Sequence, residues 1–305
     1  MLKRTLTGAV IFLVTALMIF SRSYSIYFFD FFVMAISYVA TYEIIKANLI
    51  EESNLNLPKK NLCYIYLPLI YCYLCYMSYS MAPSVLTSIV YQVFAFLLMI
   101  LVAFIIDLVY LKNLRKSGIE IPNELLLRGT KITAQIMLYP ITLIGTLYGF
   151  GVSGTNLLLG TVLVVTVILV TMLTDVFAYL FGMAFHKGIL ASQISPKKSI
   201  SGSIGGIIGG LVASAGVLLF SMFILKTNPF DVYPLWKVIL FFSLSGTIGS
   251  FFVQIGDLIA SAIKRRVGIK DFGKIFPGHG GMMDRIDGMM FASTFIFIIA
   301  TIMFF

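Results

Sequence analysis

The sequence predicts an all-α, polytopic integral membrane protein of about nine transmembrane helices, with the N-terminus in the cytoplasm and the C-terminus outside. Composition is the first observation behind this prediction. Of 305 residues, 59% are hydrophobic and only 11% are charged, and the mean hydropathy is +0.99. A soluble protein carries roughly 25% charged residues. The other two observations are a series of apolar stretches and an uneven distribution of Lys and Arg between them.

Each expected crossing is an apolar stretch close to the roughly 20 residues that a spanning helix needs. The first stretch follows Met-Leu-Lys-Arg and shows no small-residue cleavage site, so we expect a retained helix rather than a signal peptide. Charged or turn-forming clusters such as Glu51–Asn54 and Asn228–Asp231 separate the stretches. The nine expected spans cover about residues 5–21, 24–45, 61–81, 84–111, 132–150, 157–183, 203–225, 236–263 and 288–305.

Basic residues concentrate on one side of this arrangement. With the N-terminus in the cytoplasm, 19 of the 22 Lys and Arg residues fall in cytoplasmic segments, and only Arg22, Lys226 and Lys237 fall outside. This is the positive-inside bias of membrane proteins, and it explains the net charge of +9 without nucleic acid as a partner. It also predicts that the segments after the sixth and eighth spans both face the cytoplasm.

The chain divides into two regions. Residues 1–131 supply four expected helices, are rich in Tyr and Phe, and show no evident chemistry. Their cysteines, Cys63, Cys72 and Cys75, are interpreted as packing residues. Residues 132–305 supply five expected helices and two cytoplasmic loops with recurring polar residues, so we expect this region to be catalytic. The lack of a convincing internal repeat disfavours a transporter built from duplicated halves.

Two aspartates lie inside expected spans, where an ionisable side chain is costly and is a functional candidate by default. Asp175 lies near the cytoplasmic end of the sixth span, and Asp257 lies in the eighth. Asp257, Ser261 and Lys264 are spaced i, i+4 and i+7 and therefore share one helix face. An Asp257–Lys264 pair that only stabilises the helix is the alternative interpretation. The acids interpreted as structural are Asp30, Glu43 and Asp107.

The segment Ser261–Asp287 holds six cations, three aspartates and one of the two histidines. Its centre, Pro277–Gly281, predicts a turn whose accessible backbone amides can wrap an anion. Asp284 and Asp287, at i and i+3, can share a helix face and hold one hard cation such as Mg²⁺. Together these features indicate metal-assisted phosphoryl or nucleotidyl chemistry. Binding to anionic lipid heads would explain the cations, but neither the aspartates nor the glycines.

A second candidate segment, Ile194–Gly202, follows the sixth span. Its Ser-Pro pair predicts a turn, and two lysines flanked by hydroxyls suit a phosphate. An ordinary positive-inside loop explains these lysines equally well. The glycines that follow are interpreted first as residues of tight helix packing, and they are Gly205, Gly206, Gly209 and Gly210.

These motifs resemble those of the phosphatidate cytidylyltransferases (CDP-diacylglycerol synthases). The clear resemblance covers about residues 170–288, whereas the first half is similar only as a set of helices. Ser201 and Ala260 depart from the family pattern, which commonly has glutamate at these places. The family signature is matched at Ser261, Lys264, Arg265, Lys270, Asp271, Gly273, Pro277, Gly278, His279, Gly280, Gly281, Asp284, Arg285 and Asp287, and further upstream at Asp175, Ala178, Tyr179, Gly182, Ser195–Lys198, Gly256 and Asp257.

The resemblance implies that CTP and phosphatidic acid give CDP-diacylglycerol and pyrophosphate for phospholipid biosynthesis. The metal centre of the family corresponds to Asp257 and Asp284, so we expect both to bind Mg²⁺, with Asp287 as a third ligand. A second cation such as K⁺ is also considered. The residues expected to act in catalysis are Asp257, Asp284, Lys264, Arg285 and His279. Those expected to bind substrate are Ser195, Lys197, Lys198, Ser199, Arg265, Lys270, Asp271, Gly280 and Gly281.

Two other functions stay open on the sequence alone. A CTP-dependent lipid kinase of the polyprenol type would transfer the γ-phosphate to a lipid alcohol. An ion transporter would use Asp175 and Asp257 as ion sites, but it has little need for the glycine–histidine turn. The expected partners are CTP, phosphatidic acid, membrane lipids and a second copy of the chain in a homodimer, with no nucleic acid. The expected location is the inner (cytoplasmic) membrane, with the site facing the cytoplasm.

Overall fold

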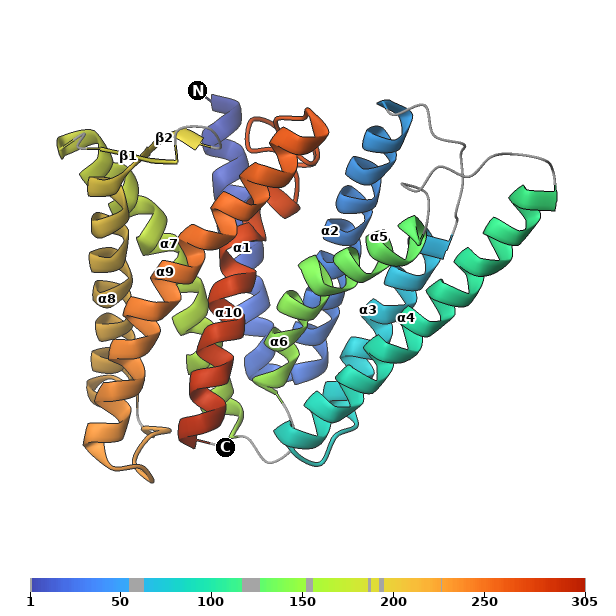
Figure 1. The fold of residues 1–305 in the computed structure, drawn as a ribbon. Helices are drawn as coiled ribbons and strands as arrows, with labels where there is room; N and C mark the ends of the chain where they lie inside the picture. The colour runs from blue at the N-terminus through green and yellow to red at the C-terminus, as the bar shows by residue number, and fades with distance from the viewer. Residues whose placement is uncertain are drawn as a thin grey trace.

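The structure, a computed structural model, describes residues 2–54, 63–116, 127–151, 156–185, 188–191, 195–225 and 227–304. Helices make up nearly all of this part of the chain (Figure 1). They are α1 (Leu2–Tyr24), α2 (Ile26–Asn54), α3 (Cys63–Ser80), α4 (Val85–Lys116), α5 (Arg128–Ile136), α6 (Leu143–Gly149), α7 (Leu157–Phe185), α8 (Ile200–Phe223), α9 (Leu235–Val267) and α10 (Met283–Phe304).

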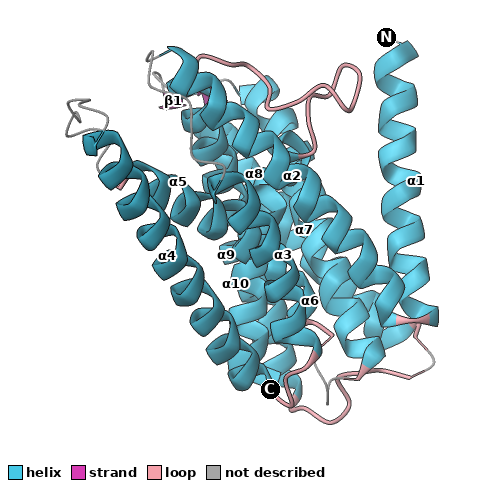
Figure 2. Ribbon diagram, turned by 90° about the vertical axis from the view of Figure 1, so that its right-hand side faces the viewer, coloured by secondary structure: helices cyan, strands magenta, loops and turns pink. Residues whose placement is uncertain are grey.

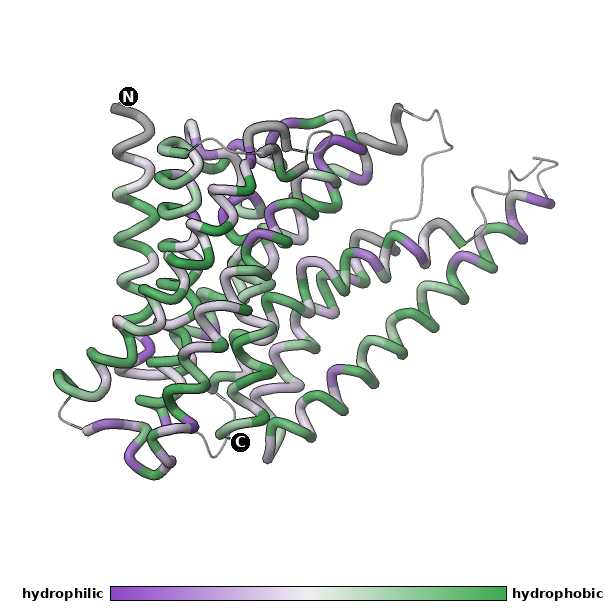
Figure 3. Tube along the Cα trace, turned by 60° about the vertical axis from the view of Figure 1, so that its left-hand side comes forward, coloured by the Kyte–Doolittle hydropathy of each residue, from purple (hydrophilic) through white to green (hydrophobic). Residues whose placement is uncertain are grey.

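Seven helical segments of the described residues are long and apolar enough to cross a membrane. They match seven of the nine expected spans. The expected spans 5–21 and 61–81 are not among them: the first corresponds to the short apolar part of α1, Thr7–Arg22, and the second to α3, which has 18 residues. Hydrophobic residues run along the middle of the helices, and hydrophilic residues gather mostly at the two ends of the bundle (Figure 3). The all-α polytopic fold is therefore confirmed, whereas the nine crossings and their direction stay predictions. The two chain termini lie at opposite ends of the bundle (Figure 1).

The most extensive packing joins α7 to α8, α9 to α10 and α8 to α9. Helices α1 and α4 lie at opposite edges of the bundle (Figure 2). Close packing of α8 depends on its glycines, because a Cβ at Gly205 or Gly209 would collide with α7 and one at Gly210 would collide with α9. The packing role predicted for these glycines is confirmed. Cys72 and Cys75 are also buried as predicted, whereas the side chain of Cys63 lies outside the described residues.

The fifth expected span is not a regular helix. Between α5 and α6 lies a π-helical turn, Met137–Thr142, which contains Pro140 and the non-helical residue Tyr139 (φ −133°, ψ 106°). Proline removes a backbone N–H and disrupts the helical hydrogen-bond ladder. The break turns the Tyr139 ring toward α10, where its centroid lies 6.0 Å from that of Phe291. The predicted division at residues 131 and 132 falls inside α5 and stays a prediction.

A small two-stranded sheet adds to the helices and was predicted only as a loop. Strand β1 (Ile189–Ala191) pairs antiparallel with β2 (Ser195–Ser199), and Ser199 lies opposite Ile189. The last residue of β2 begins the next helix, since Ser199 Oγ accepts a hydrogen bond of 3.0 Å from Gly202 N and caps α8. The sheet thereby fixes the basic segment directly beside the helix bundle.

Candidate active site

The two segments predicted to carry the chemistry lie at the same end of the bundle as the N-terminus (Figure 1). One is the β1–β2 hairpin. The other is the segment between α9 and α10, which begins at Gly268 with a left-handed φ of 78°. Glycine accepts this conformation without a steric penalty, so it ends α9 and lets the chain turn back.

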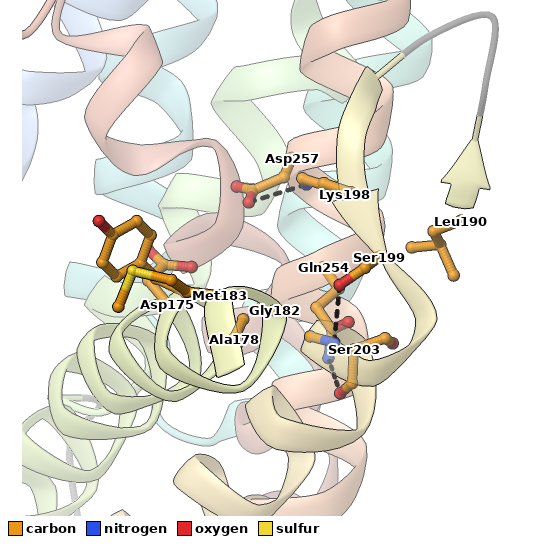
Figure 4. A pocket seen from close by; sticks show the side chains of 12 residues that line it. Asp175, Ala178, Gly182, Met183, Leu190, Lys198, Ser199, Ser203, Gln254 and Asp257 are labelled. Atoms are coloured by element: carbon orange, nitrogen blue, oxygen red, sulfur yellow. Dashed lines mark hydrogen bonds and ion pairs between the residues drawn. The ribbon is translucent and has the colours of Figure 1, made fainter. Parts of the chain in front are cut away.

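A cavity of about 460 Å³ opens between α7, the start of α8 and α9. Figure 4 shows Lys198 of β2 reaching Asp257 of α9, with Asp175, Ala178, Gly182 and Met183 of α7 nearby. Lys198 Nζ lies 3.0 Å from Asp257 Oδ2, and the two side chains are 29% and 27% exposed. The cavity therefore contains an ion pair that solvent can reach. The residues that line it are Asp175, Ala178, Tyr179, Gly182, Met183, Leu190, Lys198, Ser199, Gly202, Ser203, Gln254 and Asp257.

Asp175 and Asp257, the two aspartates predicted inside spans, belong to this one cavity. They come from different helices and lie close enough to repel each other electrostatically, while Lys198 and Arg285 attract Asp175. Two carboxylates and Lys198 thus line one cavity, and Arg285 of α10 acts electrostatically on one of the carboxylates. Such a mixed cluster suits a bound metal and a polyanion better than it suits an apolar ligand.

Lys264 does not pair with Asp257 along its own helix. Its Nζ instead lies 2.7 Å from Oδ1 of Asp284, the second residue of α10, and the side chain of Asp284 is only 3% exposed. The other carboxylate oxygen of Asp284 accepts hydrogen bonds from Phe272 N at 2.8 Å and Gly281 N at 2.9 Å. Asp284 therefore ties together α9, the connecting segment and α10.

The glycine-rich turn is held by its own backbone. Phe276 N donates to Gly280 O at 2.9 Å, and His279 N donates to Phe276 O at 2.9 Å. Gly278 and Gly280 have φ values of 82° and 87°, which other residues adopt only with strain. The tight turn predicted for this segment is confirmed.

Glu43 of α2 contacts the candidate site, which the sequence does not predict. Its carboxylate accepts hydrogen bonds from Met282 N at 3.1 Å and Met283 N at 2.8 Å, and the residue is 3% exposed. The signal was available, because Glu43 is an ionisable residue inside an expected span. From the sequence alone, Glu43 is interpreted as structural, because no local pattern in the sequence connects it with Met282 and Met283.

Tyr139 is a second residue that the sequence did not indicate. Its hydroxyl is buried and has no hydrogen-bond partner among the described residues. It lies near the carboxylates of Asp287, Asp257 and Asp284, which all act on it electrostatically. The broken fifth span thus brings a polar group to the same acidic region.

The remaining predicted site residues lie on β2, at the end of α9, in the segment between α9 and α10, and at the start of α10. Ser195 is partly exposed at the start of β2, and the side chain of Lys197 lies outside the described residues. His279 is partly buried, and its Nδ1 has no hydrogen-bond partner in the described part of the chain. The exposed residues of the set are Arg265, Lys270, Asp271 and Arg285. The roles predicted for all of them stay predictions.

The acidic residues suit a hard cation. Asp287 accepts a hydrogen bond from Gly288 N at 3.0 Å and lies near Asp257 and Asp175. Within the described residues, no three acidic, Cys or His side chains form a ready metal cluster. Mg²⁺ is, however, usually held by one or two carboxylates plus phosphate oxygens of the substrate. Asp257 and Asp287 fit that pattern, whereas Asp284 would join a metal only by giving up Lys264.

Comparison of the amino-acid sequence with known proteins identifies a family. The sequence model of the cytidylyltransferase family matches residues 2–303. Phosphatidate cytidylyltransferases of Staphylococcus aureus (strain COL) and Staphylococcus haemolyticus are 40% and 39% identical over 123 residues, which is 40% of this chain and 43% of each relative. The phosphatidate cytidylyltransferase of Aquifex aeolicus is 35% identical over 130 residues, 42% of each chain. The matched part of the chain thus spans less than half the length of these relatives. Since the family model covers nearly all of the sequence, the chain belongs to the cytidylyltransferase family.

Proposed function

We propose that the protein transfers the cytidylyl group of CTP to phosphatidic acid and forms CDP-diacylglycerol and pyrophosphate. The observation that carries this proposal is the Lys198–Asp257 pair inside a cavity at the end of the membrane helices. The cavity combines charged groups for a nucleotide with apolar groups for a lipid. The relatives named phosphatidate cytidylyltransferase support this choice of substrates.

The reaction needs little help from a general base. The phosphate monoester of phosphatidic acid is largely dianionic near neutral pH, since the second pKa of such esters is about 6. One of its oxygens attacks the α-phosphorus of CTP, and the bond from that phosphorus to the oxygen bridging toward the β-phosphate breaks. Pyrophosphate leaves with the bonding electrons. The main obstacle is the repulsion between two anions, which nearby cations reduce.

Lys198 is proposed to bind phosphate oxygens, because it already lies in the cavity opposite Asp257. The hydroxyl of Ser199 lines the same cavity, and Arg285 approaches Asp175 from α10. Arg285 is proposed to stabilise the negative charge that develops on the phosphates in the transition state. The turn at His279, Gly280 and Gly281 is assigned to the triphosphate, with Arg265 and Lys270 as further cations of the same segment, and Lys197 of β2 is assigned to phosphate groups together with Lys198.

Asp257 and Asp287 are proposed as the main metal ligands. Bound Mg²⁺ would offset the repulsion between the phosphates and stabilise the leaving pyrophosphate. The contribution of the protein is to hold the two carboxylates at the junction of α9 and α10, where Gly256 and Gly288 let the helices approach closely. Asp284 is proposed first to hold the turn and Lys264, and to bind metal only when Lys264 is displaced.

The lipid is proposed to approach from the side of α7. Tyr179 and Met183 line the cavity and are 68% and 61% exposed, so they offer apolar surface to acyl chains. The phosphate of the lipid would then meet Lys198 at the polar end of the cavity. This arrangement fits a site at the cytoplasmic surface of an inner membrane, which is the orientation that the basic residues predict.

The experiment that tests this proposal is a product assay with the full-length protein in detergent micelles. Phosphatidic acid, CTP and Mg²⁺ are added, and the lipid fraction is analysed by mass spectrometry. We expect CDP-diacylglycerol with the wild-type protein and none with Asp257→Asn at equal thermal stability. A folded wild-type protein that leaves phosphatidic acid unchanged would refute the proposal.

A further inference from the structure

Glu43 is a buried carboxylate whose contacts reach across the chain. It lies on α2, within the segment Ile26–Asn48 that is long and apolar enough to cross a membrane, and it is 3% exposed. Its two oxygens bind the backbone N–H groups of Met282 and Met283, which are 239 and 240 residues away. Burying a carboxylate is costly unless hydrogen bonds compensate for the lost water. Here the N-terminus of α10 compensates, because its N–H groups have no partners within the helix and carry partial positive charge.

The connecting segment is shaped around this carboxylate. A Cβ at Gly273 or at Gly281 would collide with the carboxylate oxygens of Glu43. The two glycines lie on opposite arms of the turn, so Glu43 occupies the space that side chains would otherwise fill. Both glycines also belong to the motif that led to the family resemblance. This geometry explains why these two positions lack a side chain.

The contacts continue from Glu43 into the proposed site. Gly281, the residue before Met282, donates its N–H to Asp284, and Asp284 pairs with Lys264. Three successive N–H groups, those of Gly281, Met282 and Met283, are therefore held by two carboxylates. A shift of Met282 and Met283 would move Gly281 and Asp284 with them.

A second N-terminal helix contacts the same turn. Thr7 of α1 donates a hydrogen bond of 3.1 Å from its hydroxyl to Pro277 O. The turn between α9 and α10 is thus contacted from outside by both α1 and α2. The first half of the chain, which shows no chemistry in its sequence, has a role in the structure of the site.

We propose that Glu43 is a positioning residue for the nucleotide. It holds the glycine turn in the place where Gly280 and Gly281 meet the triphosphate, and it holds the first turn of α10 where Asp284 pairs with Lys264. Glu43 itself does not contact the substrate. This inference rests on the proposed function for the meaning of the turn, but the contacts of Glu43 do not depend on it.

The test compares Glu43→Gln with Thr41→Val in the full-length protein. Glutamine has the shape of glutamate, but its amide nitrogen cannot accept a hydrogen bond, so one of the two N–H groups loses its partner. Thr41 is a buried residue of the same helix, and its hydroxyl lies 3.5 Å from Cys72 Sγ of α3. Thr41→Val therefore removes a buried polar contact of α2 without affecting Glu43.

The first measurement is hydrogen–deuterium exchange of peptides that cover residues 276–286. We expect faster exchange in Glu43→Gln than in the wild-type protein and no change in Thr41→Val. Equal exchange in all three proteins would show that Glu43 does not hold the turn. This readout needs no substrate, so it remains decisive even if the proposed reaction fails.

The second measurement is steady-state kinetics at saturating Mg²⁺. We expect the KM for CTP to rise about tenfold in Glu43→Gln, the effect of losing one hydrogen bond to a charged group, while the KM for phosphatidic acid stays within about twofold. A variant that melts earlier but keeps the wild-type KM for CTP would make Glu43 merely structural. A lower KM would show that Glu43 competes with the nucleotide, which also contradicts the proposal. A wild-type protein without transferase activity would refute the proposed function and the nucleotide role together.

Discussion

Lys264 and Asp284 form an ion pair of 2.7 Å that joins the last turn of α9 to the first turn of α10. Lys198 and Asp257 form a second pair of 3.0 Å, which faces the cavity. In the first pair, the side chain of Lys264 is 15% exposed and that of Asp284 is 3% exposed. In the second pair, Lys198 is 29% exposed and Asp257 is 27% exposed. The two pairs therefore differ in solvent access, and we expect substitutions in them to have different effects.

Lys264→Met should destabilise the protein. The substitution leaves the Asp284 carboxylate buried without its cation, a change that costs about 3 kcal/mol. Chemical denaturation in micelles measures this loss. The matched control is Lys264→Met combined with Asp284→Asn, which should recover part of the stability because no unpaired charge remains. If Lys264→Met were as stable as the wild-type protein, the pair would not hold the two helices together.

Lys198→Ala should reduce activity strongly and change stability little. A pair with this solvent access contributes less than about 1 kcal/mol to stability, so the melting temperature should change little. The rate of CDP-diacylglycerol formation should fall about 100-fold, since a charge that stabilises the transition state is removed. Lys237→Ala, in the first turn of α9 at the other end of that helix, is the control and should keep normal activity. A large loss of stability in Lys198→Ala would contradict this interpretation.

Gly281→Ala should strongly reduce activity and lower stability. Its methyl group would collide with the Glu43 carboxylate and displace the turn. Gly216→Ala in α8 is the matched control, because a Cβ there meets no atom within 4 Å. Removing a glycine from a helix interior should leave activity unchanged and stabilise the protein by up to about 1 kcal/mol. Similar behaviour of the two variants in activity and melting assays would argue against a tight fit around Glu43.

Removal of divalent cations should abolish product formation, and added Mg²⁺ should restore it. Asp287→Asn should raise the Mg²⁺ concentration needed for half-maximal activity, because one proposed oxygen ligand loses its charge. Asp231→Asn, an exposed aspartate between α8 and α9 and outside the proposed site, is the control for the loss of one negative charge. An unchanged Mg²⁺ requirement in Asp287→Asn would remove Asp287 from the proposed metal site.

The local parts of this structure could be predicted from the sequence. Membrane helices follow from runs of apolar residues, since a span must satisfy its own backbone hydrogen bonds. The turn at Pro277–Gly281 follows from residue types that accept left-handed backbone conformations. The packing of α8 through Gly205 and Gly209 follows from helical spacing.

The long-range partners could not be predicted in the same way. Spacing along one helix suggested Asp257 as the partner of Lys264, but the turn at Gly268 brings Asp284 closer. Glu43 binds a helix end more than 200 residues away, and no local pattern indicates this contact. The β1–β2 hairpin is too short for a strand signal, and it contains Pro196, which favours a turn or an edge strand.

Cytidylyl transfer at the cavity of Lys198 and Asp257 is tested most directly by following two labels from CTP. The wild-type protein is incubated with phosphatidic acid and Mg²⁺, using CTP labelled at the α-phosphorus in one sample and at the γ-phosphorus in the other. The account predicts that the α-label enters the lipid fraction and the γ-label is released as pyrophosphate. Transfer of the γ-label to a lipid, with the α-label left in soluble CDP, would contradict it and indicate a lipid kinase.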